Sequence, residues 1–404
     1  MMTKLGIIRE GKTPPDKRVP LTPRQCAELL EAYPNLEIFV QPSPIRAFSD
    51  SAYADQGIEL REDLSNCDIL MGVKEVPVDM LIPNKRYMFF SHTFKEQPYN
   101  RKLLKAIIDK KISLIDYEVL TTSGGKRLIG FGRYAGIVGS YNAMLAVGKK
   151  FGLYDLKPAH KCHDRKEVEQ ELKKVVLPDN FKIVLTGNGR VAHGALEILS
   201  LLPIKKVSPE RYLNESFNQP VYAQLAVSDY AKTKDGSKVV RSEFYEHPER
   251  FDSNFMPFAK ESDLYIPCHY WDHDAPYIFT REDAKRTDFR IKVVADISCD
   301  IDGPVASTLR PSTIADPFYG YDPKTETETD FMNPDAIGVM AVDNLPCELP
   351  KDASEDFGRE LIKNIFPELL GKKKSAVIAR ATETTLDGEL AEDYKYLSDY
   401  LAGE

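Results

Sequence analysis

Short apolar runs alternate with stretches of helical period along the first 120 residues. The apolar runs cover residues 5–8, 36–40, 67–73, 87–90 and 112–116. Helical stretches begin at Thr22-Pro23 and cover about 100–110. Strands that are apolar throughout and alternate with helices predict a parallel sheet with helices on both faces. The first part of the chain is therefore predicted to be an α/β unit.

A second series of apolar runs begins after residue 180. These runs are short and rich in β-branched residues, and they cover 181–187, 221–227, 263–268, 292–298 and 338–343. A small-residue-rich helix over about 134–152 is expected to connect the two series, and the helical segment after residue 350 is expected to return to the first unit. The predicted fold class is α/β, with two Rossmann-like domains built on parallel sheets. The expected domains are 1–138 plus 346–404, and 139–345.

The strongest local motif lies where the first strand of the second unit ends. In KIVLTGNGRVAHGALEIL (182–199), Gly187, Gly189 and Ala192 fit the pattern G-x-G-x-x-A between a strand and a helix. The first glycine permits a tight turn, the second lets the backbone approach a pyrophosphate, and the small third residue lets helix and strand pack closely. This context predicts a dinucleotide site.

Asp229 is a candidate reader of the ribose, because it follows the expected strand over 221–227. A carboxylate there accepts hydrogen bonds from the ribose hydroxyls and repels a 2′-phosphate, which favours NAD over NADP. Its distance from Gly187 is about twice the usual spacing of roughly 20 residues, so an insertion is expected, in the polar stretch 205–220. The alternative is that Asp229 is only a turn residue.

In the first unit, the candidate catalytic and binding residues come after expected strands. Arg18, in the cationic loop REGKTPPDKRVPLTP (9–23), can bind a carboxylate through both arms of its guanidinium. Lys74 follows the run 67–73 and His92 follows the run 87–90, which places both where α/β folds hold ligands. Such a lysine and histidine can act as acid and base near neutral pH. Alternatively, each is an ordinary surface charge or buried polar residue.

Taken together, these motifs resemble the alanine dehydrogenase and saccharopine dehydrogenase superfamily. The resemblance is greater to its saccharopine branch, which includes the lysine-ketoglutarate reductase half of a bifunctional lysine-degrading enzyme. The matching stretches follow one another along nearly the whole chain: 9–23, GVKEVP (72–77), FFSHTFKEQ (89–97), 114–136, HPERF (247–251), PCHYWDHDAP (267–276), VADIS (294–298), TIADPFYGYD (313–322) and 342–361.

The resemblance implies an active site in the cleft between the two domains and a specific reaction. Saccharopine, NAD and water would be interconverted with L-lysine, 2-oxoglutarate and NADH, and Lys74 and His92 match the acid/base pair. The positions that match substrate contacts are Arg18, Gln97, Arg127 and Phe131. Those similar in place to cofactor-side residues are Gly187, Gly189, Arg190, Val191, Asp229, Thr233, Tyr270, Asp296 and Asp343. Val191 also stands where the fungal enzymes have one cysteine of a redox-active disulfide, so this disulfide is expected to be absent although Cys268 matches the other position.

Composition and charge narrow the remaining choices. The formal net charge of −8 argues against a nucleic-acid partner. No apolar run approaches the roughly 20 residues that cross a bilayer, and six scattered cysteines fit reduced thiols. The histidines of 160–163 and 269–273 lack a clear complement of further ligands, so no metal is expected. We therefore expect a cytoplasmic monomer or small homo-oligomer that binds an amino acid and a 2-oxo acid and no membrane.

Two alternatives stay open at this point. An alanine dehydrogenase-like enzyme acting on pyruvate and ammonia would share the 9–23 loop and the Lys74/His92 pair, but HTFKEQ (92–97) and DNLP (343–346) favour the saccharopine branch. A regulator that binds NAD without turnover would not need Lys74 and His92, which are both present.

Overall fold

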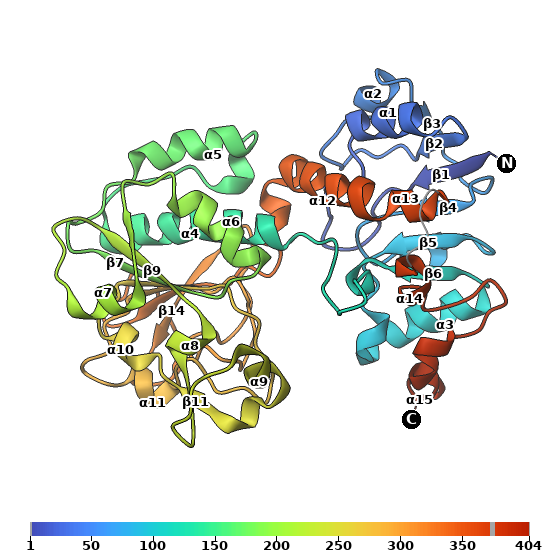
Figure 1. Ribbon diagram of the computed structural model, residues 1–404. Helices are drawn as coiled ribbons and strands as arrows, with labels where there is room; N and C mark the ends of the chain where they lie inside the picture. Colours follow the sequence, from blue (N-terminus) through green and yellow to red (C-terminus); the bar gives the residue numbers. More distant parts are fainter. Residues whose placement is uncertain (1, 372–375, 404) are drawn as a thin grey trace. The chain divides into compact units, whose positions relative to one another are not determined.

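The computed structural model describes residues 2–371 and 376–403 and divides the chain into two compact units (Figure 1). Unit 1 comprises Met1–Phe131 and Pro350–Glu404, and unit 2 comprises Gly132–Leu349. Residues 1, 372–375 and 404, which belong to the expected first domain, lie outside the described residues.

Unit 1 is built on a six-stranded sheet in the order β3-β2-β1-β4-β5-β6, with parallel pairing throughout. Its strands are β1 (Thr3–Ile7), β2 (Leu36–Val40), β3 (Glu59–Leu60), β4 (Ile69–Met71), β5 (Arg86–Phe89) and β6 (Ser113–Asp116). Its α-helices are α1 (Pro23–Ala32), α2 (Asp50–Ala54), α3 (Arg101–Asp109), α12 (Pro350–Asn364), α13 (Phe366–Leu369), α14 (Val377–Arg380) and α15 (Ser398–Ala402). All but β3 lie within one or two residues of the predicted apolar runs, because both faces of the sheet are buried. The two-residue strand β3 was not predicted.

The C-terminal segment packs against the N-terminal part of unit 1. Ser354, on α12, accepts a hydrogen bond from the amide of Val19 at 2.9 Å, and the side chain of Gln25, on α1, donates to the carbonyl of Glu355 at 2.7 Å. Further along, the amide of Glu383 donates to the carbonyl of Leu114 at 2.8 Å, so the segment pairs with the free edge of β6. This pairing satisfies backbone groups that an edge strand would otherwise leave open.

Unit 2 is built on an eight-stranded sheet in the order β15-β14-β16-β13-β12-β7-β9-β8. Its strands are β7 (Lys182–Thr186), β8 (Lys205–Val207), β9 (Val221–Leu225), β12 (Leu264–Pro267), β13 (Val293–Ala295), β14 (Phe318–Asp322), β15 (Thr327–Thr329) and β16 (Ile337–Met340). Its α-helices are α4 (Gly132–Phe151), α5 (Arg165–Glu171), α6 (Arg190–Leu199), α7 (Pro209–Asn214), α8 (Val227–Tyr230), α9 (Arg241–Glu246), α10 (Met256–Ala259) and α11 (Arg281–Ala284). A separate hairpin pairs β10 (Ala231–Thr233) with β11 (Phe251–Ser253).

The predicted α/β class with large parallel sheets is confirmed, with one exception at the edge of the second sheet. There β14 runs antiparallel to β16 and to β15. Residues 323–326 connect β14 to β15, and so short a connection permits only an antiparallel pair.

The predicted connector helix is instead part of unit 2. A Cβ on Gly136 of α4 would lie 1.9 Å from the carbonyl oxygen of Val191 on α6, so the two helix backbones touch near the start of α4. A Cβ on Gly194 of α6 would likewise meet the carbonyl oxygen of Arg133 at 1.9 Å. The second unit therefore begins at Gly132 and not at residue 139, and it ends at Leu349 and not at residue 345.

Within the described residues, none of the helices combines the length and the apolar character that crossing a bilayer requires.

Candidate active site

Titratable side chains gather where the parallel strands of unit 1 end. β1 leads to Glu10, β4 to Lys74, β5 to His92 and β6 to Glu118. These four strands are parallel neighbours, so their carboxyl ends lie along one edge of the sheet, where α/β folds bind ligands. The structure thus brings Lys74 and His92, which the sequence singled out separately, to the same edge.

Two carboxylates that the sequence analysis missed face the His92 ring. Nδ1 of His92 lies 2.9 Å from Oε1 of Glu75, and Nε2 lies 3.6 Å from Oε2 of Glu118. The first distance is a hydrogen bond, and the second is too long for one. Glu75 therefore fixes the ring through Nδ1, and neither of these two carboxylates is hydrogen-bonded to Nε2.

Cations hold both carboxylates in their charged form. Burial raises the pKa of Glu75, but the hydrogen bonds with His92 and with Lys12 outweigh it and lower the pKa to about 2; the Lys12 Nζ lies 2.5 Å from Oε2. Burial also raises the pKa of Glu118, yet Arg127 at 2.6 Å and Lys95 at 2.9 Å lower it. Arg127, predicted as a substrate contact, thus belongs to the same charged network.

Lys74 is placed by Glu10, another residue that the sequence analysis missed. The two carboxyl oxygens of Glu10 accept the backbone amides of Val73 at 2.6 Å and of Lys74 at 2.9 Å. Burial raises the pKa of Glu10 to about 7, against these amide bonds, which lower it. The half-buried Lys74 also lowers the pKa of Asp16, so its charge acts on that carboxyl as well.

Arg18 was predicted to clamp a substrate carboxylate, and the structure gives it a partner within the chain. Its Nε and one terminal nitrogen bond to the two oxygens of Asp16 at 3.0 and 2.6 Å. Its guanidinium lies 4.1 Å from the ring centroid of Phe131, which stacks on Phe357 of α12 at 4.5 Å. A substrate carboxylate at Arg18 would have to share it with Asp16. Gln97, the other predicted contact, has an exposed side chain.

The Asp16–Arg18 pair leads to a prediction about acid stability. Burial raises the pKa of Asp16, but the Arg18 charge and hydrogen bonds lower it from 3.8 to about 2. A lowered pKa in the folded state stabilises the protein above the unfolded pKa of 3.8, and this stability is lost as the pH falls through about 2. The contribution is about 2 kcal/mol, since one pKa unit is about 1.4 kcal/mol.

Asp16→Asn is therefore expected to lower the unfolding free energy by at least about 2 kcal/mol at neutral pH, and by less as the pH falls. Urea unfolding from neutral pH down to about pH 3 measures both effects. Asp79→Asn, at an exposed position, is the matched control. Parallel pH curves for wild type and Asp16→Asn would contradict the assignment.

The glycine turn of unit 2 has the shape that a dinucleotide requires. Gly187 has a φ of +105°, and a Cβ there would lie 2.6 Å from the carbonyl oxygen of Cys268, so only glycine fits. Gly189 is the N-cap of the ten-residue helix α6, and a Cβ there would meet no atom within 4 Å. The open space beside Gly189, at the N-terminal end of α6, fits a pyrophosphate. Arg190 and Val191 lie in the first turn of α6. The side-chain amide of Gln224 stabilises the glycine turn by donating to the Gly187 carbonyl at 3.0 Å.

The other cofactor-side candidates follow strands of the same sheet. Asp229, Tyr270, Asp296 and Asp343 come after β9, β12, β13 and β16, which are parallel to β7, so they share one edge with the glycine turn. Tyr270 is 69% exposed and Asp343 is exposed. Burial raises the pKa of Asp296 to about 6, although the Thr308 hydroxyl, at 2.7 Å, lowers it. Thr233 lies instead on β10, where its hydroxyl donates to the Ser237 carbonyl at 2.5 Å.

The long spacing before Asp229 has a structural reason. β8 and α7 occupy the stretch 205–220, and β8 takes the outer place in the sheet, so that β9 pairs directly with β7. Asp229 therefore follows the strand next to the glycine turn. Its carboxylate accepts the amide of Ala226 at 2.7 Å, so it also caps its own turn.

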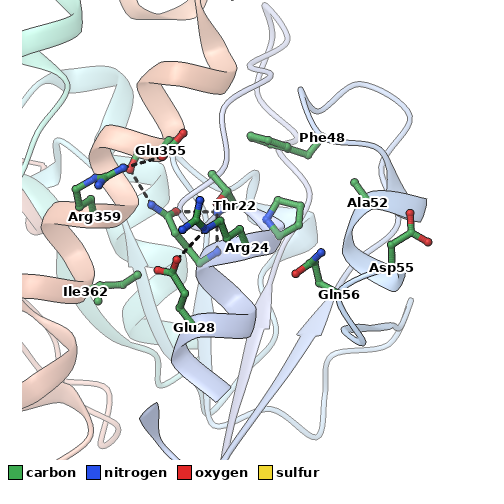
Figure 2. A pocket seen from close by; sticks show the side chains of 12 residues that line it. Thr22, Arg24, Glu28, Phe48, Ala52, Asp55, Gln56, Glu355, Arg359 and Ile362 are labelled. Carbon is green, nitrogen blue, oxygen red and sulfur yellow. Dashed lines mark hydrogen bonds and ion pairs between the residues drawn. The ribbon is translucent and has the colours of Figure 1, made fainter. Parts of the chain in front are cut away.

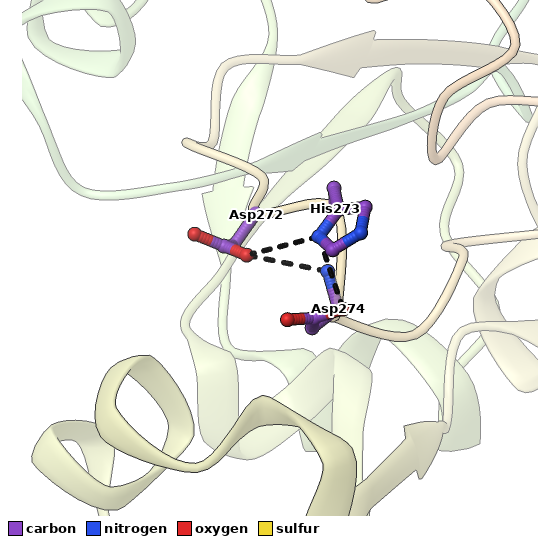
Figure 3. Close-up of side chains that lie close together, drawn as sticks. All are labelled: Asp272, His273 and Asp274. Carbon is purple, nitrogen blue, oxygen red and sulfur yellow. Dashed lines mark hydrogen bonds and ion pairs between the residues drawn. The ribbon is translucent and has the colours of Figure 1, made fainter. Parts of the chain in front are cut away.

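Two other features do not add to the site. Asp272, His273 and Asp274 lie close enough to share an ion (Figure 3), but they are neighbours on a loop, and His273 and Asp274 are exposed. A pocket of about 490 Å³ lies between α1, α2 and α12 (Figure 2), and none of the predicted site residues lines it. None of the six cysteines, all of them in the described part of the chain, forms a disulfide, Cys268 included.

The missed carboxylates had a signal in the sequence. Glu75 directly follows Lys74 in GVKEVP, and Glu118 comes two residues after the end of β6 in LIDYEV. Each follows a predicted strand that is close in sequence or in the sheet to Lys74 or His92, the two residues that the sequence analysis had selected. Charged residues after strands are common on protein surfaces. The missed carboxylates are therefore distinguished from other such residues only by the sheet edge that they share with Lys74 and His92.

Comparisons with known proteins agree with these motifs. The family described as alanine dehydrogenase/PNT, N-terminal domain, matches residues 6–138. Alpha-aminoadipic semialdehyde synthase of Arabidopsis thaliana is 32% identical over 398 residues, which cover 88% of this chain and 37% of that protein. The chain thus spans less than half the length of this relative. Saccharopine dehydrogenase (NAD(+), L-lysine-forming) of Schizosaccharomyces pombe is 26% identical over 377 residues, 89% of this chain and 91% of that protein.

Among solved structures, an L-alanine dehydrogenase superposes with a TM-score of 0.64 at 16% identity, covering 99% of both chains. This likeness shows a common fold. In sequence, the chain is similar to saccharopine dehydrogenases and alpha-aminoadipic semialdehyde synthases over most of its length, and over residues 6–138 it matches the alanine dehydrogenase/PNT family.

Proposed function

We propose that the chain is an NAD-dependent saccharopine dehydrogenase that interconverts saccharopine, NAD and water with L-lysine, 2-oxoglutarate and NADH. The observation that carries the proposal is the position of Lys74 and His92 after the ends of the adjacent strands β4 and β5, next to a network of carboxylates and cations. Relatives named saccharopine dehydrogenase that match along most of their length support the same chemistry.

The residues of unit 2 fit the dinucleotide. Gly187 and Gly189 leave space for the pyrophosphate at the N-terminal end of α6, and Asp229, after the neighbouring strand, is placed to accept hydrogen bonds from the ribose hydroxyls. Arg190, Val191, Thr233, Tyr270, Asp296 and Asp343 are the further cofactor-side residues of the proposal. When bound, NAD accepts the hydride that leaves the carbon next to the secondary amine of saccharopine.

The proton transfers of the reaction are assigned to side chains of unit 1. The secondary amine must lose a proton before the hydride leaves, and the Lys74 Nζ, in its neutral form, is the base proposed for it. The resulting imine is hydrolysed, which requires an activated water and a proton for the departing lysine nitrogen. Nε2 of His92 takes the proton from this water, since Nδ1 is engaged by Glu75.

Substrate charge gives the cations at this edge a role in binding. Saccharopine carries three carboxylates, and each calls for a charge-assisted partner. Arg18 and Arg127 are the proposed anchors, with Gln97 as a polar contact and Phe131 as an apolar wall. Lys12 and Lys95 add positive charge at the same edge. Pyruvate or alanine, with one carboxylate, would leave most of these groups unused.

Steady-state assays decide between the proposal and its alternatives. We expect oxidation of NADH that requires both lysine and 2-oxoglutarate, and reduction of NAD by saccharopine. Oxidation of NADH with pyruvate and ammonia, and none with lysine and 2-oxoglutarate, would instead identify an alanine dehydrogenase-like enzyme. Binding of NADH without turnover of either pair would identify a regulator.

A further inference from the structure

A buried chain of four polar side chains runs beneath the turn that presents His92. Oδ2 of Asp116 lies 2.5 Å from the Ser91 hydroxyl, the Ser91 hydroxyl 2.6 Å from that of Thr93, and the Thr93 hydroxyl 2.5 Å from Oε2 of Glu383. All four residues are buried, and both carboxylic residues have an exposed fraction of 0%. The chain therefore joins two carboxyl groups in the interior of unit 1.

Counting hydrogens shows that one of these carboxyl groups is protonated. Three oxygen–oxygen contacts of 2.5–2.6 Å each need one hydrogen between the two oxygens. The hydroxyls of Ser91 and Thr93 supply two. With both carboxyls ionised, each hydroxyl would donate to its own carboxylate, and the Ser91–Thr93 contact would bring two oxygens together without a hydrogen. The third hydrogen must come from Asp116 or Glu383.

The backbone decides which of the two carries it. Oδ2 of Asp116 accepts the amides of Ser91 at 2.8 Å and of His92 at 3.2 Å, and Oδ1 accepts the amide of Glu118 at 2.6 Å. Burial raises the pKa of Asp116, but the hydrogen bonds that it accepts from Ser91 and from the Glu118 amide lower it and so favour the anion. Oε1 of Glu383, by contrast, has no hydrogen-bond partner among the described residues. Burying an oxygen without a hydrogen bond costs much less free energy for a neutral carboxyl group than for a carboxylate.

The surroundings of Glu383 agree with this choice. Burial raises its pKa well above the usual value, and the charges of Asp116 and Glu118 raise it further against the Thr93 hydrogen bond. The phenols of Tyr394 and Tyr396 also respond to the charge of Glu383, which raises their pKa. The pairing of the Glu383 amide with Leu114, at the edge of β6, holds the residue in this position.

The anion at Asp116 ties together the two parts of the proposed acid/base site. It holds the amide of His92, whose φ of +57° is unusual for a residue with a side chain, and the amide of Glu118, which faces the His92 ring. Without an acceptor, the turn would leave buried amides unpaired.

We propose that Glu383 is a neutral carboxylic acid that donates through Thr93 and Ser91 to the ionised Asp116, and that Asp116 is the positioning residue that fixes the His92 turn. The effect on turnover rests on the function proposed above; the place of the proton does not.

Two isosteric substitutions test where the proton lies. In Glu383→Gln the amide nitrogen can donate to Thr93 as the neutral acid does, so kcat and its pH profile should stay within about threefold of wild type. In Asp116→Asn the amide nitrogen meets backbone donors, so kcat should fall about tenfold or more with a changed pH profile. NADH binding, which rests on unit 2, should be unchanged in both. The reverse pattern, with Asp116→Asn tolerated and Glu383→Gln damaging, would overturn the proposal.

An infrared difference spectrum tests the same point without turnover. At neutral pH, wild type minus Glu383→Gln should contain the carbonyl stretch of a protonated carboxylic acid, and wild type minus Asp116→Asn should contain a carboxylate band. The absence of the acid band from the first spectrum would refute the neutral Glu383. This measurement stands even if the chain turns over no saccharopine or if Asp116→Asn fails to fold, since the first spectrum needs only Glu383→Gln.

Discussion

Replacing Lys74 with methionine is expected to lower kcat about 10²- to 10⁴-fold, the usual contribution of a general acid or base. Methionine keeps much of the length and volume of the side chain but cannot take the proton from the secondary amine. The backbone amide that bonds to Glu10 is retained, so the local structure should persist. NADH should bind almost as tightly as to wild type, because the proposed cofactor residues belong to unit 2.

Steady-state kinetics and NADH fluorescence titration measure the two effects. Lys102→Met is the matched control, since Lys102 is exposed on α3, and it should behave as wild type. If Lys74→Met turned over saccharopine at the wild-type rate, the role proposed for this amine would be wrong. A loss of NADH binding equal to the loss of kcat would point to a general defect of the fold instead.

The second large effect is expected at the glycine turn, where two alanine substitutions should behave differently. Gly187→Ala forces a Cβ to within 2.6 Å of the Cys268 carbonyl oxygen at a φ of +105°. It should lower the unfolding free energy by about 2–4 kcal/mol through clash and backbone strain. Gly189→Ala has open space around its Cβ and a φ of −88°, so stability should change by less than about 0.5 kcal/mol.

NADH affinity separates structure from function in this pair. The Cβ of Gly189→Ala would occupy the space through which the pyrophosphate approaches the backbone, so affinity should fall about tenfold or more although the fold is intact. Urea unfolding and NADH titration on both variants provide the comparison. Wild-type NADH affinity in Gly189→Ala would mean that the dinucleotide does not lie against this turn.

Lys74 and His92 lie next to a network of carboxylates and cations, so their roles depend on these neighbouring charges. Glu75 and Glu118 are held as anions by Lys12, Lys95 and Arg127, and they face the His92 ring from two sides. A substrate with three carboxylates would compete for these cations. Binding and proton transfer are therefore expected to be coupled through the same side chains.

Local patterns in the sequence were sufficient for much of the fold. The strands β2, β5 and β9 begin at or within one residue of the apolar runs, because parallel strands are buried on both faces and so read as continuous apolar stretches. The glycine turn at 187–192 was equally readable, since a positive φ and a close helix approach restrict the residue type at single positions. Lys74 and His92 were singled out as candidates because each lies within two residues of the end of such an apolar run.

Contacts between distant segments were decided only by the tertiary structure. Thr93 and Glu383 are 290 positions apart in sequence, and no periodicity relates them. The same holds for Glu10 beneath Lys74, for Arg18 over the ring of Phe131, and for α4, whose small residues indicated a connector although Gly136 packs against Val191 in unit 2. Hydrophobic period and turn chemistry act over a few residues, so the sequence by itself determined the elements and the ends at which chemistry could occur. Which charged side chains pair within the core depends on which strand ends lie next to each other, and this is decided by the packing of the tertiary structure.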